Sequence, residues 1–168
     1  MGDNAFYIKN SLYPEMQFKS MLSDREILEN LKNGNLKIEN FCDECMTPNG
    51  YDVRIDECLV DDIKTFNIAK NKFFIISTIE VFEFPKNMAG QIWLRTTYAR
   101  KGIMVSGGLI DAGFRGNLNI FLYNAGDEIL MRKNERIAQV VFFKLEKEAE
   151  KDYSKRSGHY QNQTGIIK

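Results

Sequence analysis

Apolar positions along the chain follow two different periods, and the change falls near Leu36. Before it, the segment SDREILENLKNG (23–34) repeats apolar residues at the spacing of one helical face: Ile27, Leu28 and Leu31. Ser23 and Glu26 have the spacing of a capping box, and an Asn-Gly pair supplies a stop signal at the other end. The pattern predicts one short helix, and no other helix of any length in the body of the chain.

Beyond Leu36 the apolar residues come in short runs, several of which alternate with polar residues. Runs rich in Ile, Val, Phe and Tyr are separated by turn residues: LKIENF, YDVRI, KFFIISTIEVFEF, GQIWLRT, GIMVSG, NLNIFLYN, EILMRK and RIAQVVFFKL. In NLNIFLYN, Leu118, Ile120 and Leu122 share one face, and Trp93 of GQIWLRT is expected in the core. Many short strands at close spacing predict an all-β sandwich or barrel.

The patterning divides the chain into three parts. Residues 1–20 show no clear period and are interpreted as an N-terminal extension. Residues 21–150 carry the helix and the strands, and their length suits one β domain with a single core. After Leu145 the sequence becomes charged and then amide-rich, so residues 151–168 are predicted to form an exposed C-terminal arm.

Composition argues against several classes of function. The 168 residues include 23 Lys and Arg and 23 Asp and Glu, so no overall field attracts nucleic acid or an anionic membrane. An anionic ligand therefore has to be held by local groups. No apolar run approaches the length of a membrane span, and MGDNAFYIKN lacks the apolar stretch of a secretory signal, so the cytoplasm is the expected compartment.

The three cysteines, an odd number, argue against a disulfide framework. Cys42 and Cys45 form a C-x-x-C pair, which together with Cys58 and His159 could supply four zinc ligands. A second paired ligand motif is missing, and acidic residues fill the gap between the paired cysteines. Reduced thiols in a loop are therefore the favoured interpretation.

One aspartate draws attention in GGLIDAGFRG (107–116), where Asp111 follows an apolar step and lies between glycine-rich flanks. The position suits the tip or shoulder of a hairpin between GIMVSGGLI and NLNIFLYN. A carboxylate on such a turn most often hydrogen-bonds its own backbone. The glycines also permit close backbone approach to a flat ligand rich in heteroatoms. Position alone therefore leaves a structural and a functional interpretation of Asp111 open.

Five short segments, taken in order, resemble the dUTPase and dCTP deaminase superfamily across residues 21–165. They are NGYDVRI (49–55), RTTYAR (95–100), GGLIDAGFRGNL (107–118), NERIAQVVF (134–142) and HYQNQTG (159–165). Each is a weak signal alone, whereas five in register are specific. The resemblance implies a distorted jelly-roll or β-clip barrel of the dUTPase type with one short N-terminal helix. It also implies a homotrimer whose active sites lie between subunits, each closed by a C-terminal arm.

The resemblance offers two activities with different chemistry. A dUTPase hydrolyses dUTP to dUMP and pyrophosphate, and Asp111 matches the aspartate that activates the attacking water. Mg²⁺, held largely by triphosphate oxygens and water, spreads the developing charge. A dCTP deaminase instead uses a glutamate on the following strand, and Phe121 occupies that place here. Phenylalanine cannot transfer a proton, so a dUTP diphosphatase is predicted. A dCTP deaminase or bifunctional deaminase, and a non-catalytic deoxynucleotide-binding homologue, are the alternatives.

The resemblance also assigns residues to the substrate, which for the predicted activity is deoxyuridine triphosphate. The triphosphate is expected to contact Arg95, Thr96, Thr97, Arg100 and Gln139. The base and sugar are expected to contact Gly108, Phe114, Tyr153, Tyr160 and Gln163. Asp52 is expected to support the metal–water shell or to hold its strand. Without the resemblance, the arginines would be interpreted as salt-bridge partners and Phe114 as a packing residue.

Two departures from the family pattern concern the pocket. HYQNQTG is nearer to the arm of the deaminase and archaeal bifunctional type than to the glycine-rich arm of ordinary dUTPases, and His159 stands where lysine is frequent. The link between Arg100 and Asp111 is shorter than in typical members of either type. The loop around the base is therefore expected to be built differently.

Overall fold

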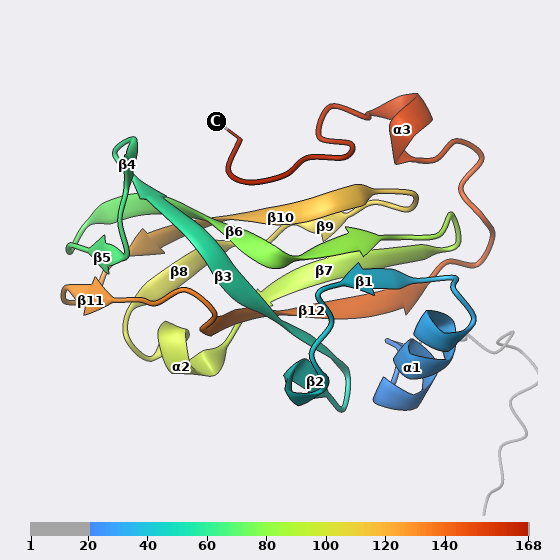
Figure 1. The fold of residues 1–168 in the computed structure, drawn as a ribbon, viewed down its shortest axis with the longest axis horizontal. Helices are drawn as coiled ribbons and strands as arrows, with labels where there is room; N and C mark the ends of the chain where they lie inside the picture. The colour runs from blue at the N-terminus through green and yellow to red at the C-terminus, as the bar shows by residue number, and fades with distance from the viewer. Residues whose placement is uncertain (1–20, 168) are drawn as a thin grey trace, which may run out of the picture.

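The computed structural model describes residues 21–167, so the extension predicted at residues 1–20 lies outside the described part. Helix α1 (Asp24–Lys32) precedes a body made mostly of strands (Figure 1). The predicted capping box is formed, since the Ser23 N–H donates to Glu26 Oε2 at 2.9 Å and the Glu26 N–H donates to Ser23 Oγ at 3.4 Å. Within residues 21–167, no helix is both long and apolar enough to cross a membrane.

The described strands are short to medium in length and are joined by tight turns. In chain order they are β1 (Lys37–Glu39), β2 (Met46–Thr47), β3 (Gly50–Val60), β4 (Ile63–Lys64), β5 (Asn67–Ile68), β6 (Lys72–Glu83), β7 (Met88–Leu94), β8 (Ile103–Ser106), β9 (Leu109–Ile110), β10 (Arg115–Asn124), β11 (Ile129–Leu130) and β12 (Arg136–Lys144). Two single-turn helices lie between strands, η1 (Asp43–Cys45) and α2 (Thr96–Ala99), and a third, α3 (Tyr153–Arg156), follows the last strand.

Ten of these strands belong to one antiparallel sheet, whose main path runs β8-β10-β6-β3-β12-β7-β9. Strand β1 pairs with β6, strands β2 and β4 pair with β3, and β5 and β11 form a separate pair. The long strand β3 lies at the centre, with β6 on one side and β12 on the other. All of the predicted strand runs are present, and the all-β prediction is confirmed.

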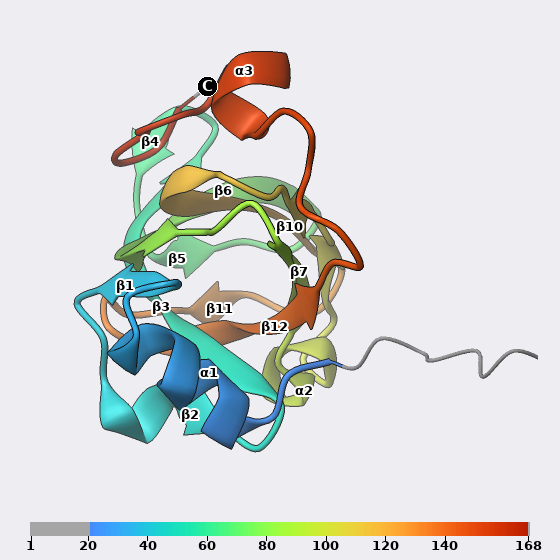
Figure 2. The same cartoon turned by 90° about the vertical axis from the view of Figure 1, so that its right-hand side faces the viewer.

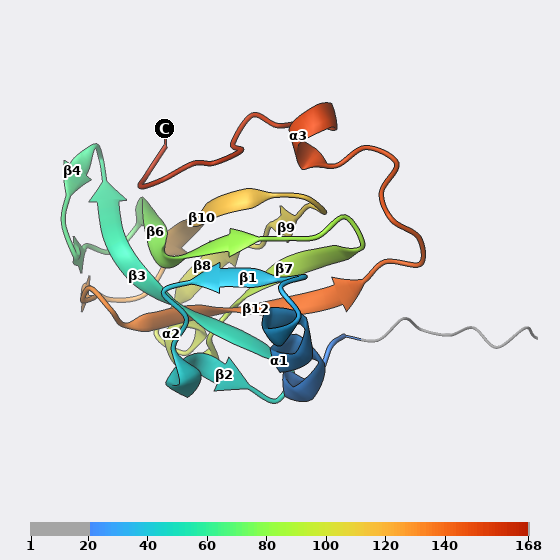
Figure 3. The same cartoon turned by 45° about the vertical axis from the view of Figure 1, so that its right-hand side comes forward.

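The sheet is strongly curled (Figures 2 and 3). Its register shifts in three pairings: β3 with β6, β10 with β6, and β12 with β3. Such irregularities bend a strand and increase its local twist. The curl brings the two ends of the sheet path, β8 and β9, near each other. These two strands are consecutive in the chain, and only Gly107 and Gly108 join them. We call this junction the seam of the barrel.

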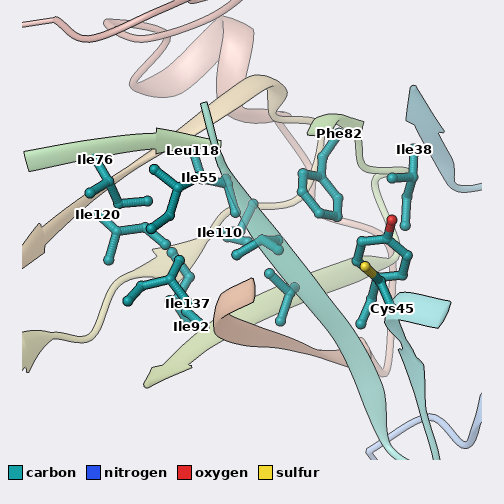
Figure 4. Close-up of a cluster of buried hydrophobic side chains, with 14 of the residues drawn as sticks. Ile38, Cys45, Ile55, Ile76, Phe82, Ile92, Ile110, Leu118, Ile120 and Ile137 are labelled. Atoms are coloured by element: carbon teal, nitrogen blue, oxygen red, sulfur yellow. The ribbon is translucent and has the colours of Figure 1, made fainter. Parts of the chain in front are cut away.

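The core fills the inside of the curled sheet (Figure 4). Leu118, Ile120 and Leu122 all face inward, as the alternation in β10 predicted, with exposures of 4%, 1% and 2%. Full burial of such a side chain stabilises the fold by about 1.5–3 kcal/mol. The core therefore fixes which side chains of β10 remain outside, and Phe121 is one of these.

One local expectation is confirmed only in part, and another is wrong. Strand β8 pairs with β10 and Asp111 lies in the connection between them, but Leu109 and Ile110 form β9 and pair with β7, so the hairpin is not a simple one. The curl of the sheet causes this, because it brings the chain from one edge strand to the other at the seam. Trp93 is not a core residue, since 55% of its surface is exposed. It points away from the core because its neighbour Ile92 points inward.

The C-terminal arm folds back over β10 of its own chain (Figure 1). The Asn162 N–H donates to the Arg115 carbonyl at 2.7 Å, and the Gln163 side-chain amide donates to the Asn117 carbonyl at 2.6 Å. Near α3 the two segments approach closely at Gly113, where an added Cβ would clash with Cβ of Asp152. Gly113 also has a φ of +83°, which favours glycine, so this contact depends on the absence of a side chain.

Candidate active site

A cavity of about 390 Å³ lies between β9, β10 and the arm. Six of the predicted site residues line it: Gly108, Asp111, Phe114, Tyr153, Tyr160 and Gln163. The seam brings β9 beside β10, and the arm closes the remaining side, so residues from three parts of the chain meet there. We call this space the Asp111 cavity.

The Asp111 carboxylate is exposed in this cavity. The turn at this point is closed by the backbone, since the Phe114 N–H donates to the Asp111 carbonyl at 3.1 Å. Within residues 21–167, no hydrogen bond or ion pair engages the carboxylate itself. The side chain is therefore not needed to form the turn, and its oxygens can accept a proton or a hydrogen bond from a water molecule.

Aromatic side chains form one wall of the Asp111 cavity. The rings of Phe114 and Tyr153 meet edge to face, with centroids 5.5 Å apart. The Tyr153 hydroxyl accepts a hydrogen bond from the Tyr160 N–H at 3.1 Å, which links the wall to the arm. Phe121 also lines the cavity and is 52% exposed. A wall of this kind suits the flat, partly apolar ring of a nucleoside.

A second cavity, of about 320 Å³, lies outside the sheet at the end of β7. It gathers Arg95, Thr96, Thr97, Gln139 and Asp52, all singled out in the sequence, together with Thr47, Trp93 and Leu94. We call this space the Arg95 cavity. Hydroxyl, amide and guanidinium groups dominate this set, and these are donors that suit phosphate oxygens.

The buried carboxylate of Asp52 holds the Arg95 side chain in this cavity. Its carboxylate is 5% exposed and lies 3.0 Å from Arg95 Nε and 3.6 Å from Arg136 Nη1. Burial raises the pKa of Asp52, and the charges of Arg95 and then Arg136 oppose that shift. Arg95 Nη1 also donates to the Arg136 carbonyl at 3.1 Å. The guanidinium of Arg95 is thus held in place before any ligand binds.

The two cavities share no lining residue. Of the β7 residues, Ile92 lines the Asp111 cavity, whereas Trp93 and Leu94 at the end of the strand line the Arg95 cavity. The structure therefore brings the predicted site residues together in two separate cavities. Within a single chain, these two cavities do not form one binding site.

Arg100 belongs to neither group. It caps the C-terminal end of α2 and lines a third, open cavity of about 720 Å³ together with Lys70, Lys101 and Asp127. Arg95 and Arg100 flank the single turn of α2, and this turn separates their side chains. The candidate zinc ligands are also not gathered, since residues 21–167 contain no group of three or more His, Cys, Asp and Glu suited to a metal. All three cysteines are free thiols.

The sequence patterns did not identify three residues that lie at or near the Arg95 cavity. Thr47 accepts a hydrogen bond from the Gln139 side-chain amide at 2.6 Å, and Arg136 contacts Asp52. Arg136 lies inside the segment NERIAQVVF, so its place in that segment was an available signal. Trp93 had a signal too, because strand alternation puts it opposite Ile92. Thr47 had none, because its contact depends on how β2 lies against β12.

Comparison with known proteins gives the family to which this chain belongs. A family model described as dCTP deaminase-like matches residues 55–145. The dCTP deaminase of Pyrococcus horikoshii is 32% identical over 139 residues, which cover 77% of this chain and 87% of the relative. A probable deoxyuridine 5'-triphosphate nucleotidohydrolase of Sulfolobus islandicus rod-shaped virus 1 is 29% identical, with coverage of 87% and 96%. The chain belongs to the dCTP deaminase-like family.

Solved structures agree on the fold. The 2'-deoxycytidine 5'-triphosphate deaminase from Agrobacterium tumefaciens superposes with a TM-score of 0.65 at 16% identity, over 74% of this chain and 47% of that one. This chain thus spans about half the length of the Agrobacterium protein. The EIAV dUTPase superposes with a TM-score of 0.51 at 21% identity, over 69% of this chain and 92% of that one. The dUTPase-like barrel predicted from the five segments is therefore confirmed.

Proposed function

We propose that this protein is a dUTP diphosphatase that hydrolyses dUTP to dUMP and pyrophosphate. One observation carries the proposal: the Asp111 cavity combines an unengaged carboxylate with the phenyl ring of Phe121. Asp111 is the one carboxylate among the described residues that line this cavity. A single exposed carboxylate suits the activation of a water molecule.

In the proposed reaction, the Asp111 carboxylate takes a proton from a water molecule, and the oxygen of that water attacks the α-phosphorus of dUTP. The bond from that phosphorus to the bridging oxygen breaks, and pyrophosphate leaves with the bonding electron pair. Phe114 and Tyr153 supply an apolar wall for the deoxyribose and the base. Arg95, Thr96, Thr97 and Gln139 supply donors for the triphosphate.

Mg²⁺ is the cation that we propose to accompany the triphosphate. Asp52 does not fit as its ligand, because its buried carboxylate already contacts two guanidinium groups. The metal would therefore be held by phosphate oxygens and water, and it would supply charge neutralisation to the substrate. The protein contributes the guanidinium of Arg95, which Asp52 holds in position.

We further propose that each complete site is shared between copies of the chain, in a homotrimer. The support is geometric: the residues that would contact the nucleoside and those that would contact the triphosphate line two separate cavities that share no lining residue. A second copy that presents its Arg95 cavity to the Asp111 cavity of the first would complete the site. Closed rings of identical subunits generate such repeated contacts.

A dCTP deaminase is the second candidate, because several relatives carry that name, including the proteins from Pyrococcus horikoshii and Pyrococcus abyssi. One relative, from Aquifex aeolicus, is named a dUMP-forming dCTP deaminase and is 28% identical. Deamination of cytosine requires a group that transfers protons at the base. Phe121 supplies no such group in the cavity, which is the reason that we rank this candidate second.

One assay distinguishes the candidates. The full chain is incubated separately with dUTP and with dCTP in the presence of Mg²⁺, and pyrophosphate and ammonia are both measured. Pyrophosphate from dUTP without ammonia from dCTP is the expected result. Ammonia from dCTP would overturn the ranking in favour of a deaminase. Tight binding of either nucleotide with neither product would show a binding protein rather than an enzyme.

A further inference from the structure

The C-x-x-C pair lies on a tight turn whose geometry permits a disulfide. Cys42 is the N-cap residue of η1 and Cys45 is its last residue, and the Cys45 N–H donates to the Cys42 carbonyl at 3.0 Å. Residues that close a turn in this way have Cα atoms less than about 7 Å apart. Disulfides need a Cα separation of roughly 4.4–6.8 Å. Both thiols are free in the structure, so the pair is present in its reduced form.

The two thiols have different environments. Cys45 is 2% exposed and lies among the core side chains (Figure 4), whereas Cys42 is partly exposed. Burial, with the neighbouring Cys42 thiol, raises the pKa of the Cys45 thiol to about 11. Cys42 Sγ donates to Glu44 Oε2 at 2.9 Å. A reagent in solution therefore reaches Cys42 first, and Cys45 lies beneath it as the second thiol.

The same turn supports the Arg95 cavity through its backbone. The Glu44 carbonyl, between the two cysteines, accepts a hydrogen bond from Arg136 Nη1 at 2.8 Å. The same nitrogen of Arg136 lies 3.6 Å from the Asp52 carboxylate, which holds Arg95. A continuous chain of polar contacts thus runs from the turn to the arginine of the cavity.

A second connection runs through β2, which directly follows Cys45. Thr47 lines the Arg95 cavity and bonds Gln139, as described above. Strand β2 pairs with β3 at two positions only, Met46 with Tyr51 and Thr47 with Gly50. A strand this short follows the turn before it, because few contacts hold it independently.

We propose that Cys42 and Cys45 form a thiol–disulfide exchange site for a small-molecule disulfide, and that its oxidation weakens phosphate binding in the Arg95 cavity. The Cys42 thiolate attacks one sulfur of the reagent, forms a mixed disulfide and releases one thiol. Cys45 then loses its proton to solvent, attacks the Cys42 sulfur and releases the second thiol. Two protein thiols and one disulfide thus become one protein disulfide and two small thiols.

The effect on the cavity follows from the position of Glu44. Oxidation removes the S–H that Cys42 donates to Glu44 Oε2, so Glu44 loses this restraint and its carbonyl is expected to lose the bond from Arg136. Loss of one such hydrogen bond is expected to lower triphosphate affinity roughly threefold to tenfold. This coupling rests on the proposed function of the Arg95 cavity, whereas the exchange chemistry does not.

The chemistry is tested first, without any activity measurement. The reduced full chain is incubated with glutathione disulfide, the remaining thiols are alkylated, and peptides are mapped by mass spectrometry. A Cys42–Cys45 disulfide that dithiothreitol reverses is the expected product, with Cys58 alkylated only after unfolding because burial raises its pKa to about 12. A stable glutathione adduct on Cys42, or two unmodified cysteines, would overturn the exchange site whatever the enzyme does.

The coupling is tested by calorimetric titration of inorganic triphosphate into the reduced and the oxidised protein. Weaker binding to the oxidised form is expected for the wild type and for Cys58→Ala, which keeps the pair. Cys42→Ser is expected to bind equally after both treatments. Equal binding by reduced and mapped, oxidised wild type would overturn the coupling. Activity toward dUTP plays no part in this readout, so failure of the proposed function remains a separate result.

Discussion

At the scale of the residue, Asp111 is the side chain whose loss is expected to separate binding from turnover. Asp111→Asn keeps the size of the side chain and the backbone turn that the Phe114 N–H closes. It removes the base, so kcat for dUTP is expected to fall roughly 10²–10⁴-fold while the Kd of a non-hydrolysable dUTP analogue stays near that of the wild type. Steady-state kinetics and calorimetry measure the two quantities.

Asp127→Asn is the matched control for this change. Asp127 is also an exposed aspartate, but it lines the third cavity with Arg100, and among the described residues its carboxylate makes only a long contact of 3.9 Å with Lys70. Its replacement is expected to leave kcat unchanged. Nearly full turnover in Asp111→Asn would show that another group activates the water.

The sequence could identify single site residues by type but not their grouping. The carboxylate, the arginine and the hydroxyls were recognised from short segments, and they do line cavities. That Arg95 lies apart from Asp111 within one chain depends on how the curled sheet places β9 and the end of β7, and no local pattern encodes it. Trp93, in contrast, could have been placed outside the core from the sequence, because strand alternation puts it on the face opposite Ile92. Its large apolar side chain favoured the wrong prediction that it is buried.

At the scale of the element, β3 and β6 are joined by a buried ion pair. Glu80 is fully buried on β6 and accepts hydrogen bonds from Arg54 Nε at 2.7 Å and from the Arg54 N–H at 2.9 Å. Glu80→Ala leaves the guanidinium of Arg54, which is 15% exposed, without this partner. The free energy of unfolding is expected to fall by about 3–5 kcal/mol, as measured by urea denaturation.

Glu83, on the same strand, provides the comparison. Its carboxylate pairs with Lys37 at 2.8 Å, but its side chain is 43% exposed. Glu83→Ala is therefore expected to change the free energy of unfolding by less than about 1 kcal/mol. Equal losses in the two variants would mean that burial does not decide the strength of these pairs.

Elements with a clear signal were predicted well, and the others were not. Helix α1 has a capping box and an apolar face, and the long strands have alternation, so both could be recognised locally. Strands β2, β4, β5 and β9 span two residues each, which is too short to show a period. Their pairing is decided by the curl of the whole sheet, as the pairing of β9 with β7 illustrates.

At the scale of the whole molecule, a site shared between copies predicts complementation. Asp111→Asn and Arg95→Ala are each expected to be inactive alone. When the two variants are unfolded together and refolded, dUTP hydrolysis is expected to return to about a quarter of the wild-type rate, because that fraction of sites receives both intact halves. Pyrophosphate release measures the recovery.

The control mixes Asp111→Asn with Phe114→Ala. Both residues line the Asp111 cavity of one chain, so no mixture of these copies contains an intact cavity. This pair is expected to stay inactive. Recovery by the control pair, or none by the first pair, would contradict a site divided between neighbouring subunits in this way.

The exposure of Trp93 has a practical consequence, because the chain contains 1 tryptophan. Its indole is more than half exposed and lies beside Arg95, Thr96 and Gln139. Ultraviolet emission excited at the red edge of the absorption band therefore comes from one known place. Trp93 is therefore a built-in fluorescent probe of the Arg95 cavity. The wavelength and intensity of its emission report how much water surrounds the indole ring.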